Sequence, residues 1–134
     1  MDREAIFAGI KECLMDCIRV DEGDISPDSR LITDLGADSL DLLDIIFSME
    51  RHFGIKIKQG EIEKRAREGI SPEDFEENEL LKPMGVKRLR EILPEVPSES
   101  IREGMHISQI PYLFTVETFI RIVERSLSES GGGN

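Results

Sequence analysis

Two stretches near the ends of the chain repeat apolar residues at the spacing of a helix. In residues 2–19 these positions are Ile6, Ile10, Cys13, Leu14, Cys17 and Ile18. After Thr115 they are Val116, Phe119, Ile120, Val123 and Leu127. Apolar residues three or four positions apart share one face of a helix, so each stretch predicts a helix with one face in a core. Thr115 is of a residue type that caps helices, and we expect it to begin the last one.

Residues 39–53 predict a helix of a different kind, because apolar residues follow two of its faces. At about 100° per residue, one stripe contains Leu42, Ile45, Ile46, Met49 and Phe53. The second stripe contains Leu40, Leu43 and Phe47, and it is flanked by Asp41, Asp44 and Glu50. A helix of a small bundle needs only one buried stripe, so the second is expected either to pack beneath a later part of the chain or to face a partner. The acidic frame favours a partner.

The segments between these helices differ in character. Residues 20–38 contain Gly23, Pro27 and Gly36 but also several apolar residues, which predicts a packed loop. Residues 58–112 are rich in Glu, Lys and Arg and are interrupted by Gly and Pro. Within them we expect short helices at residues 61–68 and 84–93 and a helix start at residues 71–72.

Together these patterns predict an all-α protein. Its 134 residues are enough for one core, and we expect a single domain at residues 1–129. Residues 58–112 are interpreted as an ordered insertion in this domain, and residues 130–134 as a flexible tail.

The charge narrows the classes of partner. The net charge is −11, and residues 21–50 hold nine acidic residues against Arg30 alone. Such a field repels nucleic acid and anionic membranes and attracts basic proteins. Charged residues interrupt the start of the chain and no apolar run is long enough to span a membrane, so we expect a cytoplasmic location without membrane insertion. Cys13 and Cys17 are expected to be small buried residues rather than a disulfide or a metal site.

Ser39 is the candidate for chemistry. It follows Gly36 and Asp38 at the predicted start of a helix, where unpaired backbone N–H groups and the helix dipole favour an anion. The hypothesis is that Ser39 carries a phosphate-linked arm. The alternatives are that Ser39 merely caps the helix, or is phosphorylated, in a helical adaptor. An enzyme is not expected, because Ser39 lacks a Gly-x-Ser-x-Gly elbow, and His52 and His106 fit no nucleophile-base pattern.

A resemblance to a known family supports the hypothesis of an arm. The stretch Asp34-Leu35-Gly36-Ala37-Asp38-Ser39-Leu40-Asp41 resembles the phosphopantetheine attachment motif of acyl carrier proteins. The resemblance extends through residues 50–57 and resumes at Thr115. It implies a four-helix bundle of the acyl carrier type, here with additional short helices from the insertion. It also implies that Ser39 receives 4'-phosphopantetheine from coenzyme A, and that the thiol of this arm holds an acyl group as a thioester.

The same resemblance implies roles for other residues. A phosphopantetheinyl transferase would read Asp38 and Leu40. Basic-surfaced acyl synthases and acyltransferases would dock on Leu40, Asp41, Leu43, Asp44, Phe47 and Glu50. An acyl chain would be sheltered between the second and third helices of the bundle, near Ile46, Met49 and Ile57. The protein would be a monomer that shuttles acyl groups between enzymes of fatty acid or specialised lipid biosynthesis.

Residues 58–112 depart from the family, whose members have only a short segment with one small helix at this place. Residues 97–105 or 110–113 are the candidates for that third helix. The insertion is interpreted either as a specialisation for unusual acyl chains, such as those of lipid A, or as a neutral decoration. An aminoacyl or peptidyl carrier of a secondary-metabolite pathway is the other carrier function that the sequence permits.

Overall fold

The structure is a computed structural model that describes residues 2–57 and 60–132, the last three of these by their backbone alone. The chain divides into two compact units. Unit 1 consists of Met1–Ile57 and Phe114–Asn134, and unit 2 consists of Lys58–Leu113. The interpretation of residues 58–112 as an insertion in a single carrier domain, residues 1–129, stays a prediction.

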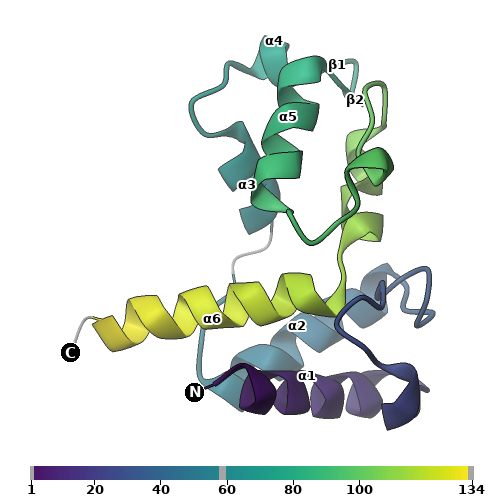
Figure 1. The fold of residues 1–134 in the computed structure, drawn as a ribbon, viewed down its shortest axis with the longest axis vertical. Helices are drawn as coiled ribbons and strands as arrows, with labels where there is room; N and C mark the ends of the chain where they lie inside the picture. The colour runs from purple at the N-terminus through teal and green to yellow at the C-terminus, as the bar shows by residue number, and fades with distance from the viewer. Residues whose placement is uncertain (1, 58–59, 133–134) are drawn as a thin grey trace. The chain divides into compact units, whose positions relative to one another are not determined.

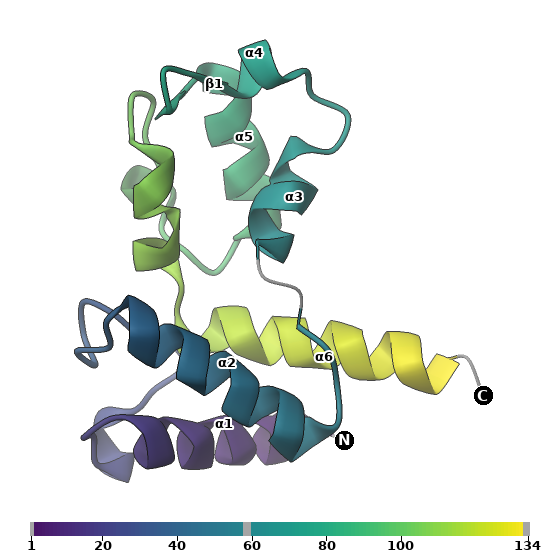
Figure 2. The same ribbon diagram turned by 180° about the vertical axis from the view of Figure 1, so that it is seen from behind.

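Unit 1 is built from three α-helices in its described residues. These are α1 (Arg3–Cys17), α2 (Ser39–Phe53) and α6 (Val116–Gly132), and a 3₁₀ turn, η1 (Glu22–Asp24), lies between the first two. Helix α1 packs against both α2 and α6, as Figures 1 and 2 show from opposite sides. The three predicted helices are therefore confirmed, and α2 has the predicted bounds. Helix α6 continues into residues 130–132, and the rest of the predicted flexible tail lies outside the described residues.

The core of unit 1 comes from the predicted apolar faces. Its fully or almost fully buried side chains include Ile6, Ile10, Leu14, Ile45, Met49, Val116, Phe119 and Val123. Helices α1 and α2 come close at Gly9, where an added Cβ would lie 2.6 Å from the Cζ atom of Phe53 and 2.8 Å from Nε2 of His52. Glycine at this position therefore allows the two helices to approach.

Unit 2 has its own core and a fold of short elements. These are α3 (Glu61–Arg67), α4 (Pro72–Phe75), β1 (Glu76–Glu77), β2 (Leu80–Leu81), α5 (Pro83–Ile92), η2 (Ser98–Ser100) and η3 (Ile107–Leu113). Helix α5 packs on α3 and α4, and Phe75, Leu89 and Ile101 are fully buried. The predicted short helices and the helix start at Pro72 are confirmed. The Ser71 hydroxyl, however, donates to the Asp74 carboxylate at 2.9 Å instead of capping a backbone amide.

The hairpin of β1 and β2 was not expected from the sequence. Glu76 pairs with Leu81 and Glu77 with Leu80 in antiparallel register. The turn residues Asn78 and Glu79 have positive φ values of 54° and 68°, as a tight two-residue hairpin turn requires. With only two residues in each strand, the all-α class is still confirmed. Of the two segments proposed for a third bundle helix, residues 97–105 contain the 3₁₀ helix η2, and residues 110–113 form the last part of the 3₁₀ helix η3, both in unit 2.

Candidate functional site at the start of α2

The loop before α2 is closed by its own hydrogen bonds. A carboxylate oxygen of Asp34 accepts from the backbone N–H of Arg30 at 2.8 Å, and the Asp34 N–H donates to the Arg30 carbonyl at 3.0 Å. Further on, the N–H of Ala37 donates to the carbonyl of Leu31 at 3.0 Å. Leu31 and Ala37 are buried, together with Ile25 and Leu35. The prediction of a packed loop is therefore confirmed.

The same loop is bonded to the chain where it enters α6. The Leu31 N–H donates to the Phe114 carbonyl at 3.2 Å, and the Val116 N–H donates to the Ser29 carbonyl at 3.0 Å. Between these two bonds, Arg30 and Thr115 face each other as an antiparallel bridge. The N–H of Glu117 adds a third bond, to the Pro27 carbonyl, at 2.9 Å. Residues 114–117, which are distant from the loop in sequence, thus hold it through backbone hydrogen bonds.

Thr115 caps α6, as its residue type predicted. Its hydroxyl accepts from the N–H of Thr118 at 3.2 Å, and the Thr118 hydroxyl accepts from the N–H of Thr115 at 3.1 Å. This reciprocal arrangement uses two of the amide groups that a helix start leaves without partners.

Helix α2 is capped by aspartates and not by Ser39. The Asp38 carboxylate accepts from the Asp41 N–H at 2.8 Å, and the Asp41 carboxylate accepts from the Asp38 N–H at 3.1 Å. Asp38 is in an extended conformation and is the N-cap, so Ser39 is the first helical residue. The alternative in which Ser39 serves as the helix cap is therefore wrong. Asp38 and Ser39 are both good capping types, and their order along the chain decided which one took the role.

Ser39 is consequently free for chemistry. Its side chain is exposed, and its hydroxyl makes no hydrogen bond within the described part of the chain. The capping box occupies the amide of Asp41, which leaves the amides of Ser39 and Leu40 as donors without an acceptor among residues 2–57 and 60–132. An uncommitted hydroxyl beside two uncommitted donors fits a residue that is esterified by a phosphate group.

The second apolar stripe of α2 is open. Leu40 is 73% exposed and Phe47 is 47% exposed, while Leu43 is half-buried. On the opposite face, Leu42, Ile45, Met49 and Phe53 are buried, whereas Ile46 is only half-buried. The described residues of unit 1 leave Leu40 and Phe47 exposed, and burial of this stripe beneath a later segment, one of the two expectations, stays a prediction. Large exposed apolar side chains in an acidic frame are typical of a docking surface.

The acidic residues around that stripe are not equivalent. Asp44 is exposed, Asp41 belongs to the capping box, and Glu50 is half-buried. The Glu50 carboxylate accepts from the backbone N–H of Ile57 at 2.8 Å. It therefore holds the chain that leaves α2 after Gly54, where φ is +67°. Glu50 was predicted as a docking residue, and the structure gives it an additional structural contact.

The residues predicted to line an acyl cavity lie at different depths. Met49 is fully buried in the stripe of α2 that faces the core, Ile57 is buried, and Ile46 is half-buried. Their predicted role in sheltering an acyl chain stays a prediction.

The cysteines and histidines have local contacts of their own. Cys13 is buried and Cys17 is half-buried, and both are free thiols. Burial raises the pKa of both thiols above the usual value. Nε2 of His52 lies 3.9 Å from the Glu12 carboxylate, and His106 contacts Glu79 and Ser108. In the described ranges no group of three or more His, Cys, Asp or Glu side chains is placed to hold a metal ion.

Comparisons with known proteins show what the residues around Ser39 are similar to. The family model described as "Phosphopantetheine attachment site" matches residues 8–79. An acyl carrier protein of Thermotoga maritima is 42% identical over 62 residues, which cover 46% of this chain and 76% of that protein. One of Rubrobacter xylanophilus is 44% identical over 64 residues, which cover 48% and 79% of the two chains. Acyl carrier protein AcpXL of Rhizobium etli is 38% identical over 72 residues, which cover 53% and 78%.

No solved structure matches this chain significantly. The family match continues past α2 through α3, α4 and β1 and ends before α6. It therefore gives no support to a resemblance that stops at residue 57 and resumes at Thr115. None of the helices formed by the described residues is both long and apolar enough to cross a membrane.

Proposed function

The chain belongs to the acyl carrier proteins, a family of carriers that bear phosphopantetheine and are not enzymes, and we propose that its Ser39 is the residue that holds the arm. The observation that carries this proposal is the uncommitted, exposed hydroxyl at the first position of α2, inside the matched region. When bound, the arm supplies a terminal thiol that holds an acyl group as a thioester. The chain itself provides the attachment point and the surface that partners recognise.

The start of α2 is suited to this role. Asp38 and Asp41 fix the backbone on both sides of Ser39 and leave its hydroxyl outside the capping box. The positive end of the helix dipole and the free amides of Ser39 and Leu40 stabilise a negative phosphate there. The carboxylates of Asp38, Asp41 and Asp44 lower this stabilisation by repulsion. A phosphate on this exposed side chain can point into solvent, where the repulsion is screened.

The proposed docking surface is the exposed stripe of α2 with its acidic frame. Leu40, Leu43 and Phe47 provide apolar anchors, and Asp44 provides an exposed charge beside them. The proposed partners are a phosphopantetheinyl transferase and the basic-surfaced acyl synthases and acyltransferases that use the cargo. Charge steering speeds their association, and a small apolar contact allows fast release. A shuttle needs both properties.

The proposed cargo is an acyl chain of fatty acid or specialised lipid biosynthesis, lipid A being one possibility. The support is the family, since the matched relatives are named acyl carrier proteins. We further propose that the carrier acts as a monomer in the cytoplasm, and that Ile46, Met49 and Ile57 lie next to the acyl chain. The intact mass of the protein purified from its own source identifies the cargo and distinguishes an acyl group from an aminoacyl or peptidyl group.

Intact mass also tests the attachment site. After incubation with coenzyme A and a phosphopantetheinyl transferase, the chain should gain the mass of one phosphopantetheine group. Ser39→Ala should gain nothing. Ser48→Ala, which removes another hydroxyl from the same helix, should be labelled like the wild type. An unlabelled wild type, or a labelled Ser39→Ala variant, contradicts the proposal.

A further inference from the structure

The loop that leads to Ser39 is held by a segment that lies outside the family match. We propose that residues 114–117, here called the strap, position Ser39 for attachment of the arm. The proposal rests on Ser39 being the attachment site. It makes efficient loading depend on a part of the chain that follows the matched residues 8–79.

Three backbone hydrogen bonds join the strap to the loop. They run from Leu31 to Phe114, from Val116 to Ser29 and from Glu117 to Pro27, with lengths between 2.9 and 3.2 Å. The first turn of a helix leaves its amide groups without intrahelical partners, and the amides of Val116 and Glu117 find theirs in this loop. The strap is thus bonded to the loop through backbone N–H groups for which α6 itself provides no acceptor.

From the strap, a short path leads to the start of α2. Leu31 donates its N–H to Phe114, and its carbonyl accepts the N–H of Ala37 at 3.0 Å. Ala37 is 3% exposed and directly precedes the N-cap Asp38, which is followed by Ser39. Leu31 therefore hydrogen bonds through its N–H to the strap and through its carbonyl to Ala37, the residue before the N-cap. Its side chain is fully buried and cannot shift freely.

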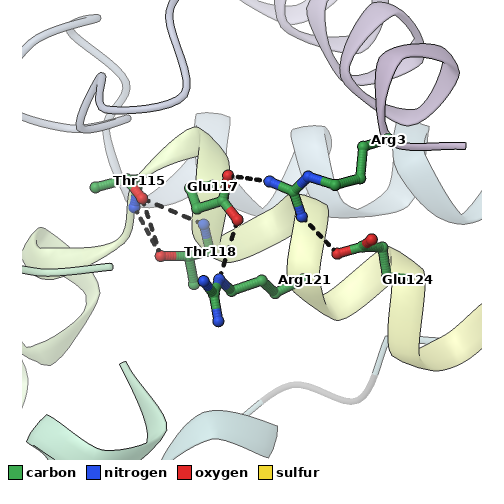
Figure 3. A network of polar contacts seen from close by, with 6 residues as sticks. All are labelled: Arg3, Thr115, Glu117, Thr118, Arg121 and Glu124. Atoms are coloured by element: carbon green, nitrogen blue, oxygen red, sulfur yellow. Dashed lines mark hydrogen bonds and ion pairs between the residues drawn. The ribbon is translucent and has the colours of Figure 1, made fainter. Parts of the chain in front are cut away.

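The strap is itself anchored to the body of unit 1. Arg3 of α1 pairs with Glu117 and, at 2.7 Å, with Glu124, both on α6. Arg121 also contacts Glu117, at 3.0 Å. Figure 3 shows these contacts beside the Thr115–Thr118 cap. The ion pairs are partly exposed and individually weak, but the two pairs of Arg3 join α1 to Glu117 of the strap and to Glu124 further along α6.

A loose loop would change the loading reaction in a specific way. A transferase has to recognise Asp38, Ser39 and Leu40 in one arrangement. If the strap is released, the loop samples other arrangements, and binding has to order it again. The lost order should raise KM for the carrier more than it lowers kcat. A general loss of stability, at a temperature where the variants remain folded, should not change KM.

Proline at position 116 tests this with little disturbance of α6. Val116 is the first residue of α6, a position where proline is well tolerated. Thr115, which precedes it, already pairs with Arg30 as an extended residue, which suits a residue before proline. Val116→Pro therefore removes the N–H that donates to Ser29. Val116→Ala is the matched reference, because it shortens the buried side chain but keeps the N–H.

Two measurements are made on the full chain with coenzyme A and a phosphopantetheinyl transferase. Relative to Val116→Ala, Val116→Pro should raise KM for the carrier about five-fold, the effect of one lost hydrogen bond, with a smaller change in kcat. Amide hydrogen exchange before loading should become faster at Leu31 and Ala37, while the interior of α2 keeps its protection.

Equal KM values for the two variants, or unchanged exchange at Leu31 and Ala37, overturn the proposal. If the wild type itself is not labelled at Ser39, the proposed function fails instead, and the exchange data still report whether the strap orders the loop. If circular dichroism shows that Val116→Pro does not fold, Glu117→Pro removes the neighbouring bond to Pro27. Glu117→Ala is its reference, because both variants lose the ion pair with Arg3.

Discussion

The carboxylate of Asp38 lies 2.8 Å from the backbone nitrogen of Asp41, and the carboxylate of Asp41 lies 3.1 Å from the backbone nitrogen of Asp38. These two hydrogen bonds lie on either side of Ser39. They give Asp38 and Asp41 a structural role in addition to any contact with partners. Charge removal at either position therefore changes the helix start as well as the surface. The two effects can be separated by choice of substitution.

Asp38→Ala should lower the free energy of unfolding by about 1 kcal/mol, because the N-cap acceptor is lost. Asp38→Ser should keep most of the stability, since serine caps helices well, while it removes the charge. Urea denaturation measures both. Loading of Asp38→Ser then reports recognition of the charge alone. A loss of stability in Asp38→Ser as large as that in Asp38→Ala would contradict the capping role.

Glu50 allows a similar separation at the other end of α2. Glu50→Ala leaves the Ile57 N–H without its acceptor and should lower the free energy of unfolding by about 1–3 kcal/mol. Glu50→Gln retains an amide oxygen and should lose less. Denaturant unfolding provides the comparison. If the two variants are equally stable, the contact with Ile57 contributes nothing to the fold, and only the predicted docking role of Glu50 is left to test.

Phe47→Ala should affect partners more than the fold. The side chain is 47% exposed, so the free energy of unfolding should change by no more than about 0.5 kcal/mol. Affinity for the transferase should fall about five-fold or more, mainly through faster release. Surface plasmon resonance separates the rates. Met15→Ala is the control, because Met15 is an exposed apolar residue of α1, at 38%, outside the proposed docking surface. Equal losses for the two variants would contradict docking on α2.

Gly9→Ala tests the close approach of α1 and α2. Alanine favours helices by about 1 kcal/mol over glycine, yet the added Cβ would overlap the ring of Phe53, 2.6 Å away. Overpacking of this kind costs about 1–3 kcal/mol, so a net loss of stability is expected. Gly23→Ala is the control, since nothing lies within 4 Å of a Cβ at that position. Thermal unfolding of the two variants decides. A Gly9→Ala variant more stable than the wild type would show that the rings move aside easily.

The thiols should make stability depend on pH in the alkaline range. In the folded chain, burial raises the pKa of Cys13 above the ordinary value of 9.0. The contribution of this thiol to stability is complete below the pKa of the unfolded chain. As pH rises above 9, the unfolded chain releases the proton first, and stability falls until the folded pKa is passed. Unfolding measured between neutral and alkaline pH should show a smaller decline in Cys13→Ala than in the wild type.

The local signals around α2 were readable from the sequence because each acts over a few residues. Gly36 and Asp38 indicate the start of the helix, and Gly54, which has a positive φ, ends it. The predicted bounds therefore agree with the structure. Which residue caps α2 was left open, because aspartate and serine are adjacent and both suit the position. The hairpin at Asn78 and Glu79 was missed because its strands are two residues long and its turn lacks glycine.

Contacts between distant segments were beyond sequence reasoning. Nothing in the spacing of apolar residues indicates that Leu31 bonds to Phe114, or that Glu50 turns its carboxylate to Ile57. These contacts depend on where the backbone passes after the elements have packed. A second apolar stripe is suited either to burial beneath a later segment or to a partner, and the structure adds that no described part of unit 1 covers Leu40 and Phe47.

The pairing of Arg3 with Glu124 also bears on how the chain is made. Unit 2 is continuous in sequence, whereas unit 1 takes its helices from both ends of the chain. On the ribosome, α1 and α2 emerge long before α6, and all of unit 2 emerges between them. The nascent chain can therefore complete unit 2 first, while the apolar face of α1 that belongs to α6 stays uncovered until α6 has been synthesised. Premature termination would leave that face exposed and the truncated product prone to aggregate.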